Sequence, residues 1–163
     1  MSMNGLPDDH SFELSSIVQQ LSSAESIDEV AQTIRASARH VIGADGVALI
    51  LRDGDFCHYV DEDAIGPLWK GQRFPMAACI SGWSMLKRQT VCIADIKQDR
   101  RIPYNLYETT FVSSLVMTPA GNPPVGALGA YWGHVYSAAP DEIAKVEALA
   151  QATGVAIKRI RGQ

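Results

Sequence analysis

Apolar side chains recur every three or four residues in three segments of the chain, which predicts three amphipathic helices. The first segment is 11–22. The second follows Ser26-Ile27-Asp28-Glu29, a capping-box pattern with a hydroxyl acceptor and a glutamate three residues later, and it stops at Gly43. The third is 140–161, which begins with a proline and two acidic residues and ends with basic residues, as the helix dipole favours. The helices therefore lie at the two ends of the chain.

Three further segments are apolar at nearly every position, which is typical of strands that are buried on both faces. They are 46–51, 112–117 and 125–132. Asp53-Gly54 is a strong turn signal, so 46–61 is predicted to form a β-hairpin. A turn at 118–124 joins the last two strands in the same way. Short connections of this kind predict a mainly antiparallel sheet. Gly126 and Gly129 in the last strand indicate close approach of another group to its backbone.

A sheet with two buried faces needs a cover on each face. The three helices can cover one face, which leaves 61–111 to cover the other. The aromatic residues of that segment are Trp69, Phe74, Trp83, Tyr104, Tyr107 and Phe111. An aromatic-rich lid over a sheet is a usual way to form a small-molecule pocket, although it can also simply complete a core. We therefore expect an α+β fold with helices on one face of the sheet, a lid on the other, and a single domain over 1–163.

Charge and composition exclude several classes of protein. The 163 residues are 47% hydrophobic and 20% charged, as in an ordinary globular domain. The formal net charge is −4 and the basic residues are scattered, so we expect no nucleic-acid partner. No uninterrupted apolar run is long enough to cross a membrane, and MSMNGLPDDH lacks the features of a signal peptide. The expected location is the cytoplasm, with no membrane contact.

The sequence contains no recognisable catalytic or metal-binding motif. The GxSxG, HExxH and phosphate-loop patterns are absent, and the four histidines lack metal-ligand spacing, so no cofactor is expected. Cys57, Cys79 and Cys92 have no CxxC spacing and are interpreted as small buried residues in a reducing compartment. The run Asp61-Glu62-Asp63 could attract a cation but is better explained as a solvated acidic turn.

Over about residues 26–157, the chain resembles a GAF domain, a sensory fold related to PAS. The order of elements matches that family: a helix pair, a hairpin, a lid, two more strands and a closing helix. The segments that carry the resemblance are Ile80-Ser-Gly-Trp83, Thr90-Val-Cys-Ile-Ala-Asp95, Asp99-Arg-Arg101, Phe111-Val-Ser-Ser-Leu-Val-Met117 and Pro124-Val-Gly-Ala-Leu-Gly-Ala-Tyr-Trp132. Similar GAF domains mostly lie beside PAS and histidine-kinase modules in bacterial signalling proteins.

The resemblance implies a non-catalytic sensory domain that binds an unidentified small molecule, forms a homodimer and controls a downstream signalling module. Some GAF domains instead reduce free methionine sulfoxide with lid cysteines. Their cysteine positions would fall near Gly82 and Tyr107–Thr110, where this chain has none, while Cys79 lies nearby. That enzyme is the alternative function. A bilin-binding role lacks a Cys-His pair in the lid, and the cyclic-nucleotide signature is missing.

Two sets of candidate site residues follow from these patterns. The candidate ligand contacts come from the lid and the neighbouring strands: Trp83, Asp95, Arg101, Tyr104, Tyr107, Phe111, Ser114 and Tyr131. Apolar residues within 143–160 also recur at steps of three and four, which is a coiled-coil-like spacing. The helices 11–22 and 140–161 are therefore interpreted as dimer or linker helices. The candidate dimer contacts are Leu14, Ile17, Ile143, Val146, Ala150, Ile157 and Ile160.

Overall fold

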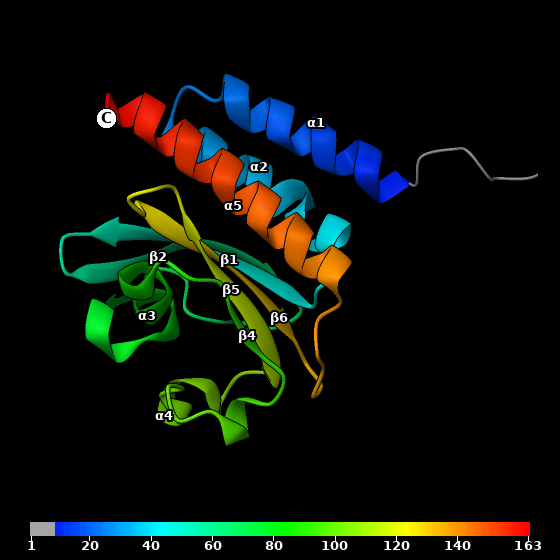
Figure 1. Ribbon diagram of the computed structural model, residues 1–163, viewed down its shortest axis with the longest axis vertical. Coiled ribbons are helices and arrows are strands. Elements are labelled where there is room, and N and C mark those ends of the chain that lie inside the picture. The colour runs from blue at the N-terminus through cyan, green and yellow to red at the C-terminus, as the bar shows by residue number, and fades with distance from the viewer. Residues whose placement is uncertain (1–8) are drawn as a thin grey trace, which may run out of the picture.

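The computed structural model describes residues 9–163, with side chains from Glu13 onward; residues 1–8, which carry most of the segment judged not to be a signal peptide, lie outside this part. Figure 1 shows the sheet with the long helices from the two ends of the chain on one side and a group of short elements on the other. In chain order the elements are α1 (Asp9–Ser23), α2 (Ile27–Ile42), β1 (Gly46–Asp53), β2 (Phe56–Ala64), β3 (Arg73–Pro75), the 3-10 helix η1 (Met76–Ala78), α3 (Ile80–Lys87), β4 (Val91–Ile93), the 3-10 helix η2 (Ile96–Gln98), α4 (Tyr104–Tyr107), β5 (Ser114–Ala120), β6 (Gly126–Trp132) and α5 (Pro140–Arg161).

The six strands form one sheet in the order β3-β2-β1-β6-β5-β4. Every neighbouring pair is antiparallel, which confirms the expected sheet type. The two hairpins, β1–β2 and β5–β6, are joined at the centre of the sheet by β1 and β6, which pair from Gly46↔Tyr131 to Leu51↔Gly126. The first and last long strands of the chain are therefore neighbours.

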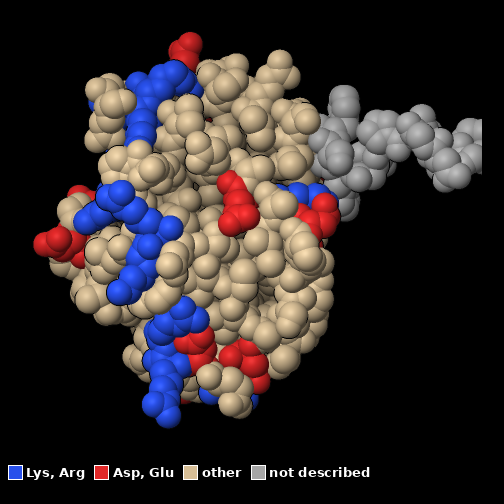
Figure 2. All heavy atoms as spheres, viewed as in Figure 1, with Lys and Arg blue, Asp and Glu red and all other residues tan. Residues whose placement is uncertain are grey.

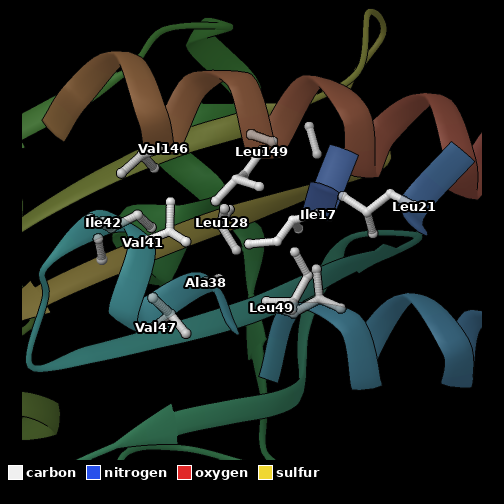
Figure 3. Close-up of a cluster of buried hydrophobic side chains, with 14 of the residues drawn as sticks. Ile17, Leu21, Ala38, Val41, Ile42, Val47, Leu49, Leu128, Val146 and Leu149 are labelled. Carbon is white, nitrogen blue, oxygen red and sulfur yellow. The ribbon is translucent and has the colours of Figure 1, made fainter. Parts of the chain in front are cut away.

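The central strands bury both faces, as their uninterrupted apolar sequences predict. Along β1, Val47 and Leu49 join a cluster on the helix side, whereas Ala48 and Ile50 join a second cluster on the lid side. Figure 3 shows the helix-side cluster, in which side chains of α1, α2 and α5 meet those of β1 and β6. The core therefore has two layers, one on each side of the sheet.

The predicted start and end of α2 are confirmed in detail. The Ser26 hydroxyl accepts a hydrogen bond from the backbone N–H of Glu29, and Gly43 ends the helix with a φ of 83°, where glycine is favoured. The Glu29 carboxylate accepts from the N–H of Glu25, one residue before the expected partner. Backbone N–H groups at the N-terminal end of α2 thus find acceptors in a variant of the predicted capping box.

Several strands are longer than the sequence pattern indicates. β2 continues to Ala64, so the acidic run 61–63 belongs to a strand and not to a turn. β5 continues through Pro119 to Ala120, where the sequence predicted a turn from Thr118. Both extensions follow from pairing, since Ala64 faces Gly46 and Ala120 faces Gly126. A partner strand holds these residues extended against their local preference.

The predicted dimer seam lies inside the core of a single chain, so that assignment is wrong for its central residues. Val146, Ala150 and Ile157 on α5 and Ile17 on α1 are 0–2% exposed and belong to the helix-side cluster. The outer members of the set are partly buried and pack against the same cluster: Leu14, Ile143 and Ile160. The spacing of three and four therefore arises from contact with the sheet, α1 and α2.

The two end helices are also tied together by polar contacts within the chain. The guanidinium of Arg159 on α5 donates to the carbonyl oxygens of Leu21 and Ala24, at 3.2 and 2.9 Å. These carbonyls lie at and just after the C-terminal end of α1, where backbone acceptors lack partners within the helix. α5 also approaches the β5–β6 turn closely at Gly154, where a Cβ would lie only 2.7 Å from the Ala120 carbonyl carbon.

In the part of the chain that the structure describes, no helix is both long and apolar enough to span a membrane. Figure 2 shows one face of the molecule, on which Lys and Arg side chains form separate groups along one side with uncharged side chains between them. The basic charge visible on this face is therefore broken into small groups.

Replacing a buried residue of α5 with a charged one should strongly destabilise the protein, whereas the same change at an exposed position of the helix should not. We expect Ile157→Glu to cost more than about 3 kcal/mol, because it buries an unpaired carboxylate and removes core contacts. Val155, which is 55% exposed on the same helix, is the matched control, and Val155→Glu should stay within about 0.5 kcal/mol of the parent. Urea unfolding followed by circular dichroism measures both. If the parent were a dimer and Ile157→Glu a folded monomer, the assignment of Ile157 to a dimer seam would be correct after all.

Candidate functional site

The second face of the sheet is covered by residues 65–112, which we call the lid. Glu62, on β2, holds the first part of the lid in place. Its carboxylate accepts hydrogen bonds from the backbone N–H groups of Leu68, Trp69 and Lys70, each at 2.9 Å. Hydrogen bonds to a charged acceptor contribute about 1.5–3 kcal/mol each. This one carboxylate therefore sets the position of the Trp69 side chain beneath the lid.

The neighbouring carboxylates also have specific partners, so the expectation of a solvated acidic turn is wrong. Asp61 is 5% exposed, pairs with Arg35 on α2 and lies 3.1 Å from the Lys70 ammonium. Asp63 accepts from Arg39 at 3.0 Å. These pairs connect β2 to α2 and to the lid.

Five aromatic rings fill the centre of the lid side, and we call them the aromatic cluster: Tyr59, Trp69, Phe74, Tyr107 and Tyr131. Trp69 lies in the middle, with ring centroids 5.6 Å from Tyr59, 4.7 Å from Tyr107 and 5.6 Å from Tyr131, all in edge-to-face arrangements. Its indole N–H donates to the Leu106 carbonyl at 3.0 Å. Pairs of this geometry stabilise a core beyond the area that they bury.

The Tyr131 hydroxyl is buried and has no hydrogen-bond partner among the described residues. The Tyr59 hydroxyl, in contrast, lies 2.9 Å from the Ser81 hydroxyl. The Tyr131 ring folds over Gly129, where a Cβ would come within 2.8 Å of the ring, so the close approach expected at this glycine comes from the chain itself. Burial holds the pKa values of Tyr59 and Tyr131 well above their usual range. Tyr131 therefore presents a neutral, unused O–H group.

Two cysteine thiols and the Ser81 hydroxyl form a polar group next to the aromatic cluster. Cys79 immediately precedes α3, and its Sγ lies 3.3 Å from the Ser81 hydroxyl oxygen. Interaction with the neighbouring Cys57 thiol, helped by Ser81 and the backbone N–H groups of residues 81 and 82, lowers the pKa of Cys79 to about 6 against the opposing effect of burial. The same interaction and burial raise the pKa of Cys57.

The third cysteine differs from the expectation of burial, because Cys92 is exposed. It lies on β4, and partial desolvation, with a smaller effect of Glu147, raises its pKa. Cys57 and Cys79 are buried as predicted. Their proximity could not be read from the sequence, since 22 residues separate them and no spacing rule applies.

The predicted ligand contacts fall in four separate places. Four of them line an open groove of about 310 Å³ beside α4: Asp95, Tyr104, Tyr107 and Phe111. Lys97, Glu108 and Val135 contribute to the same groove. Tyr107 belongs both to this groove and to the aromatic cluster, so its ring separates the groove from the buried interior.

The other predicted contacts lie elsewhere. The Arg101 guanidinium stacks 4.5 Å above the Trp83 ring and is bound to Asp99, with its Nη2 2.6 Å from Oδ2. Neither Trp83 nor Arg101 lines the groove. Ser114 is fully buried, and its hydroxyl donates to the His134 carbonyl at 2.9 Å. It therefore joins the start of β5 to the segment that follows β6. Tyr131 lies under the lid. Sequence reasoning omitted Tyr59, Ser81 and Glu62, which only the paired strands bring to this region.

Among the described residues, no group of three His, Cys, Asp or Glu side chains is placed to hold a metal ion. The lid side instead combines aromatic surfaces with hydroxyl and thiol groups. Such a lining suits a small, partly apolar organic molecule better than an ion.

Comparison with known proteins identifies the fold. A family model described as the GAF domain matches residues 24–158. No curated protein matches the sequence at a significant level. Among solved structures, the GAF domain of a phosphoenolpyruvate-protein phosphotransferase from Acinetobacter is 12% identical, with a TM-score of 0.81 over 96% of this chain and 98% of that one.

Two further solved structures are similar over most of the chain. Free methionine-R-sulfoxide reductase from Neisseria meningitidis, in complex with its substrate, is 17% identical, with a TM-score of 0.79 over 97% of this chain and 95% of that one. The GAF domain of a two-component sensor histidine kinase from Bacillus halodurans is 19% identical, with a TM-score of 0.72 over 86% and 100%. At these identities the likeness establishes the fold alone.

The antiparallel sheet, with end helices on one face and an aromatic lid on the other, defines a single-sheet α+β domain with the layers that the sequence predicts. The family match covers most of the chain, and the chain belongs to the GAF domain family. The expected family and fold class are thereby confirmed.

Removing the two buried tyrosine hydroxyls should have opposite effects on stability. Tyr59→Phe loses the bond to Ser81 and should cost about 1 kcal/mol. Tyr131→Phe removes a hydroxyl without a partner and should leave stability unchanged or raise it by up to about 1 kcal/mol. Urea unfolding of both variants is the measurement. Equal losses would mean that Tyr131 has a polar partner, such as a buried water.

Proposed function

We propose that this GAF domain is a non-catalytic sensory module that binds a small, partly apolar molecule on its lid side and regulates a signalling output module such as a histidine kinase. The observation that carries the proposal is the buried, unpartnered Tyr131 hydroxyl. An unsatisfied buried hydroxyl costs about 1–3 kcal/mol, and a ligand acceptor at that point would remove the cost.

The groove beside α4 offers the route by which such a molecule could enter. Tyr107 lines the groove and contacts Trp69, which in turn contacts Tyr131. Rotation of both the Tyr107 and the Trp69 rings would be needed to connect the groove to the Tyr131 hydroxyl. The groove lining also includes the basic Lys97 and the acidic Asp95 and Glu108, so a ligand with both an apolar body and polar substituents suits it.

β6 provides a physical connection from the ligand side to the helices. Tyr131 points to the lid side, and the next residue, Trp132, joins the helix-side cluster. The Trp132 indole N–H donates to the Gly43 carbonyl at the end of α2, at 3.1 Å. A ligand that displaces Tyr131 therefore acts on a strand that also holds α2, and tightly packed layers transmit such displacements.

The similar solved structures support a signalling role by analogy. One is the GAF domain of a sensor histidine kinase and another comes from a phosphoenolpyruvate-protein phosphotransferase. A cytoplasmic location and a homodimer remain part of the proposal. Since the central seam residues are buried, a dimer would have to use other, exposed surfaces of α1 and α5.

The ligand proposal can be tested with a thermal-shift screen of small organic molecules. A true ligand at about 100 times its Kd should add about 2.7 kcal/mol of stability. Tyr131→Phe should weaken that ligand roughly five- to tenfold, the loss of one hydrogen bond. Tyr136→Phe is the matched control, because its hydroxyl donates to Glu142 on the helix side. A ligand that binds both variants equally would not use the proposed site.

The alternative function is free methionine sulfoxide reduction, which the lowered pKa of Cys79 and the fold shared with the Neisseria enzyme favour. We expect no turnover of free methionine sulfoxide with a thiol reductant, because the positions near Gly82 and Tyr107–Thr110 lack cysteine. Turnover that Cys79→Ser abolishes and Cys92→Ser preserves would replace the sensory proposal with this enzyme.

A further inference from the structure

Three sulfur atoms meet beneath the lid at the start of α3. The Cys57 thiol on β2 donates to the Met76 thioether, with the two sulfurs 3.3 Å apart. Cys79, three residues after Met76, has its Sγ 3.3 Å from the Ser81 hydroxyl, and the two thiols lie close enough to shift each other's pKa in opposite directions. Cys57 is fully buried and Cys79 is 7% exposed. The two thiols are thus direct neighbours in a nearly closed space.

Backbone contacts fix this proximity from two directions. Cys57 pairs with Phe74 in the β2–β3 ladder, and the N–H of Met76 donates to the Asp55 carbonyl at 2.8 Å. Next, η1 turns the chain so tightly onto α3 that a Cβ at position 82 would overlap the Met76 carbonyl, which explains the glycine there. Cys79 lies within this turn and is directed back toward β2.

The two thiols occupy unequal environments. The neighbouring Cys57 thiol, the Ser81 hydroxyl and two backbone N–H groups all stabilise the thiolate of Cys79. Cys57 is fully buried on β2 and retains its proton. A pair in which one sulfur is anionic and the adjacent one is protonated has the arrangement needed for a nucleophile and a resolving thiol.

We propose that Cys57 and Cys79 form a redox-active dithiol, which hydroperoxides oxidise to an intramolecular disulfide that joins β2 to the start of α3. This modification is independent of the ligand proposed above.

The reaction balances with a hydroperoxide as the oxidant. The Cys79 thiolate attacks one peroxide oxygen, the O–O bond breaks, and hydroxide or alkoxide leaves, so that Cys79 becomes a sulfenic acid. The Cys57 sulfur then attacks the Cys79 sulfur, an S–S bond forms, and the hydroxyl group leaves with the Cys57 proton as water. Two thiols are oxidised and one hydroperoxide is reduced. A thiol reductant returns the pair to its original state.

The disulfide would restrain the lid. The loop that it closes contains Trp69, Phe74 and Met76, which all pack into the lid-side cluster. Oxidation should therefore raise the thermal midpoint and slow the opening of the lid, since a crosslink restricts the unfolded chain.

The test uses the full chain, reduced and then treated with hydrogen peroxide before the remaining thiols are alkylated. We expect a product that has lost two hydrogens, a Cys57–Cys79 linked peptide by mass spectrometry, and an alkylated Cys92. Cys57→Ser should stop at the sulfenic acid, which dimedone traps on Cys79. Cys92→Ser is the matched control and should behave as the parent does. Cys79 should react roughly tenfold faster than Cys92.

Two results would overturn the proposal. One is a folded parent protein in which Cys57 and Cys79 both remain free thiols after peroxide treatment and are therefore both alkylated. The other is oxidation confined to Cys92 or to disulfides between chains. Because the parent protein itself gives the decisive result, misfolding of a variant cannot hide a negative outcome, and circular dichroism establishes that the treated parent is folded.

Discussion

Burial of β1 and β6 on both faces is the constraint on which the other features of the fold depend. These strands pair along 46–51 and 126–131 at the centre of the sheet, and neither of their faces is exposed to water there. An apolar sheet with two buried faces needs two covers. The end helices provide one, and the lid provides the other. The lid consists of short helices and strands joined by loops, so it depends on specific anchors, above all on the Glu62 carboxylate and the Trp69 indole.

Much of this architecture follows from local sequence. The uninterrupted apolar runs predict two-sided strands, the Asp53-Gly54 turn predicts the first hairpin, and Ser26 and Gly43 predict the limits of α2. These signals are reliable because each depends on residues that are neighbours along the chain. The predicted resemblance to GAF domains adds the order of the elements, and the family match over 24–158 confirms it.

The site was less predictable because it is formed by residues that are distant in sequence. Tyr131 and Tyr107 were identified, but nothing local indicates that Trp69 lies between them or that Cys57 meets Cys79. The α5 seam was misassigned for a related reason. Its spacing of three and four marks an apolar stripe, and a stripe has the same pattern whether a second copy or the chain's own sheet covers it. Burial of Ile157 within one chain distinguishes the two.

The two faces of the sheet also differ in chemistry, which is why the lid side is the better candidate for function. Thr153, on the helix side, also has a buried hydroxyl without a partner among the described residues, but that side is otherwise filled mainly by aliphatic residues, with Trp132 and Tyr136. On the lid side, the Tyr131 hydroxyl and the Cys79 thiolate lie in the same layer, and the charge on Cys79 is one of the influences that raise the pKa of Tyr131. Phenylalanine in place of Tyr131 and alanine in place of Cys79 would fill these positions without the cost of burying a polar group. Buried polar groups that cost stability are expected where a domain binds or reacts.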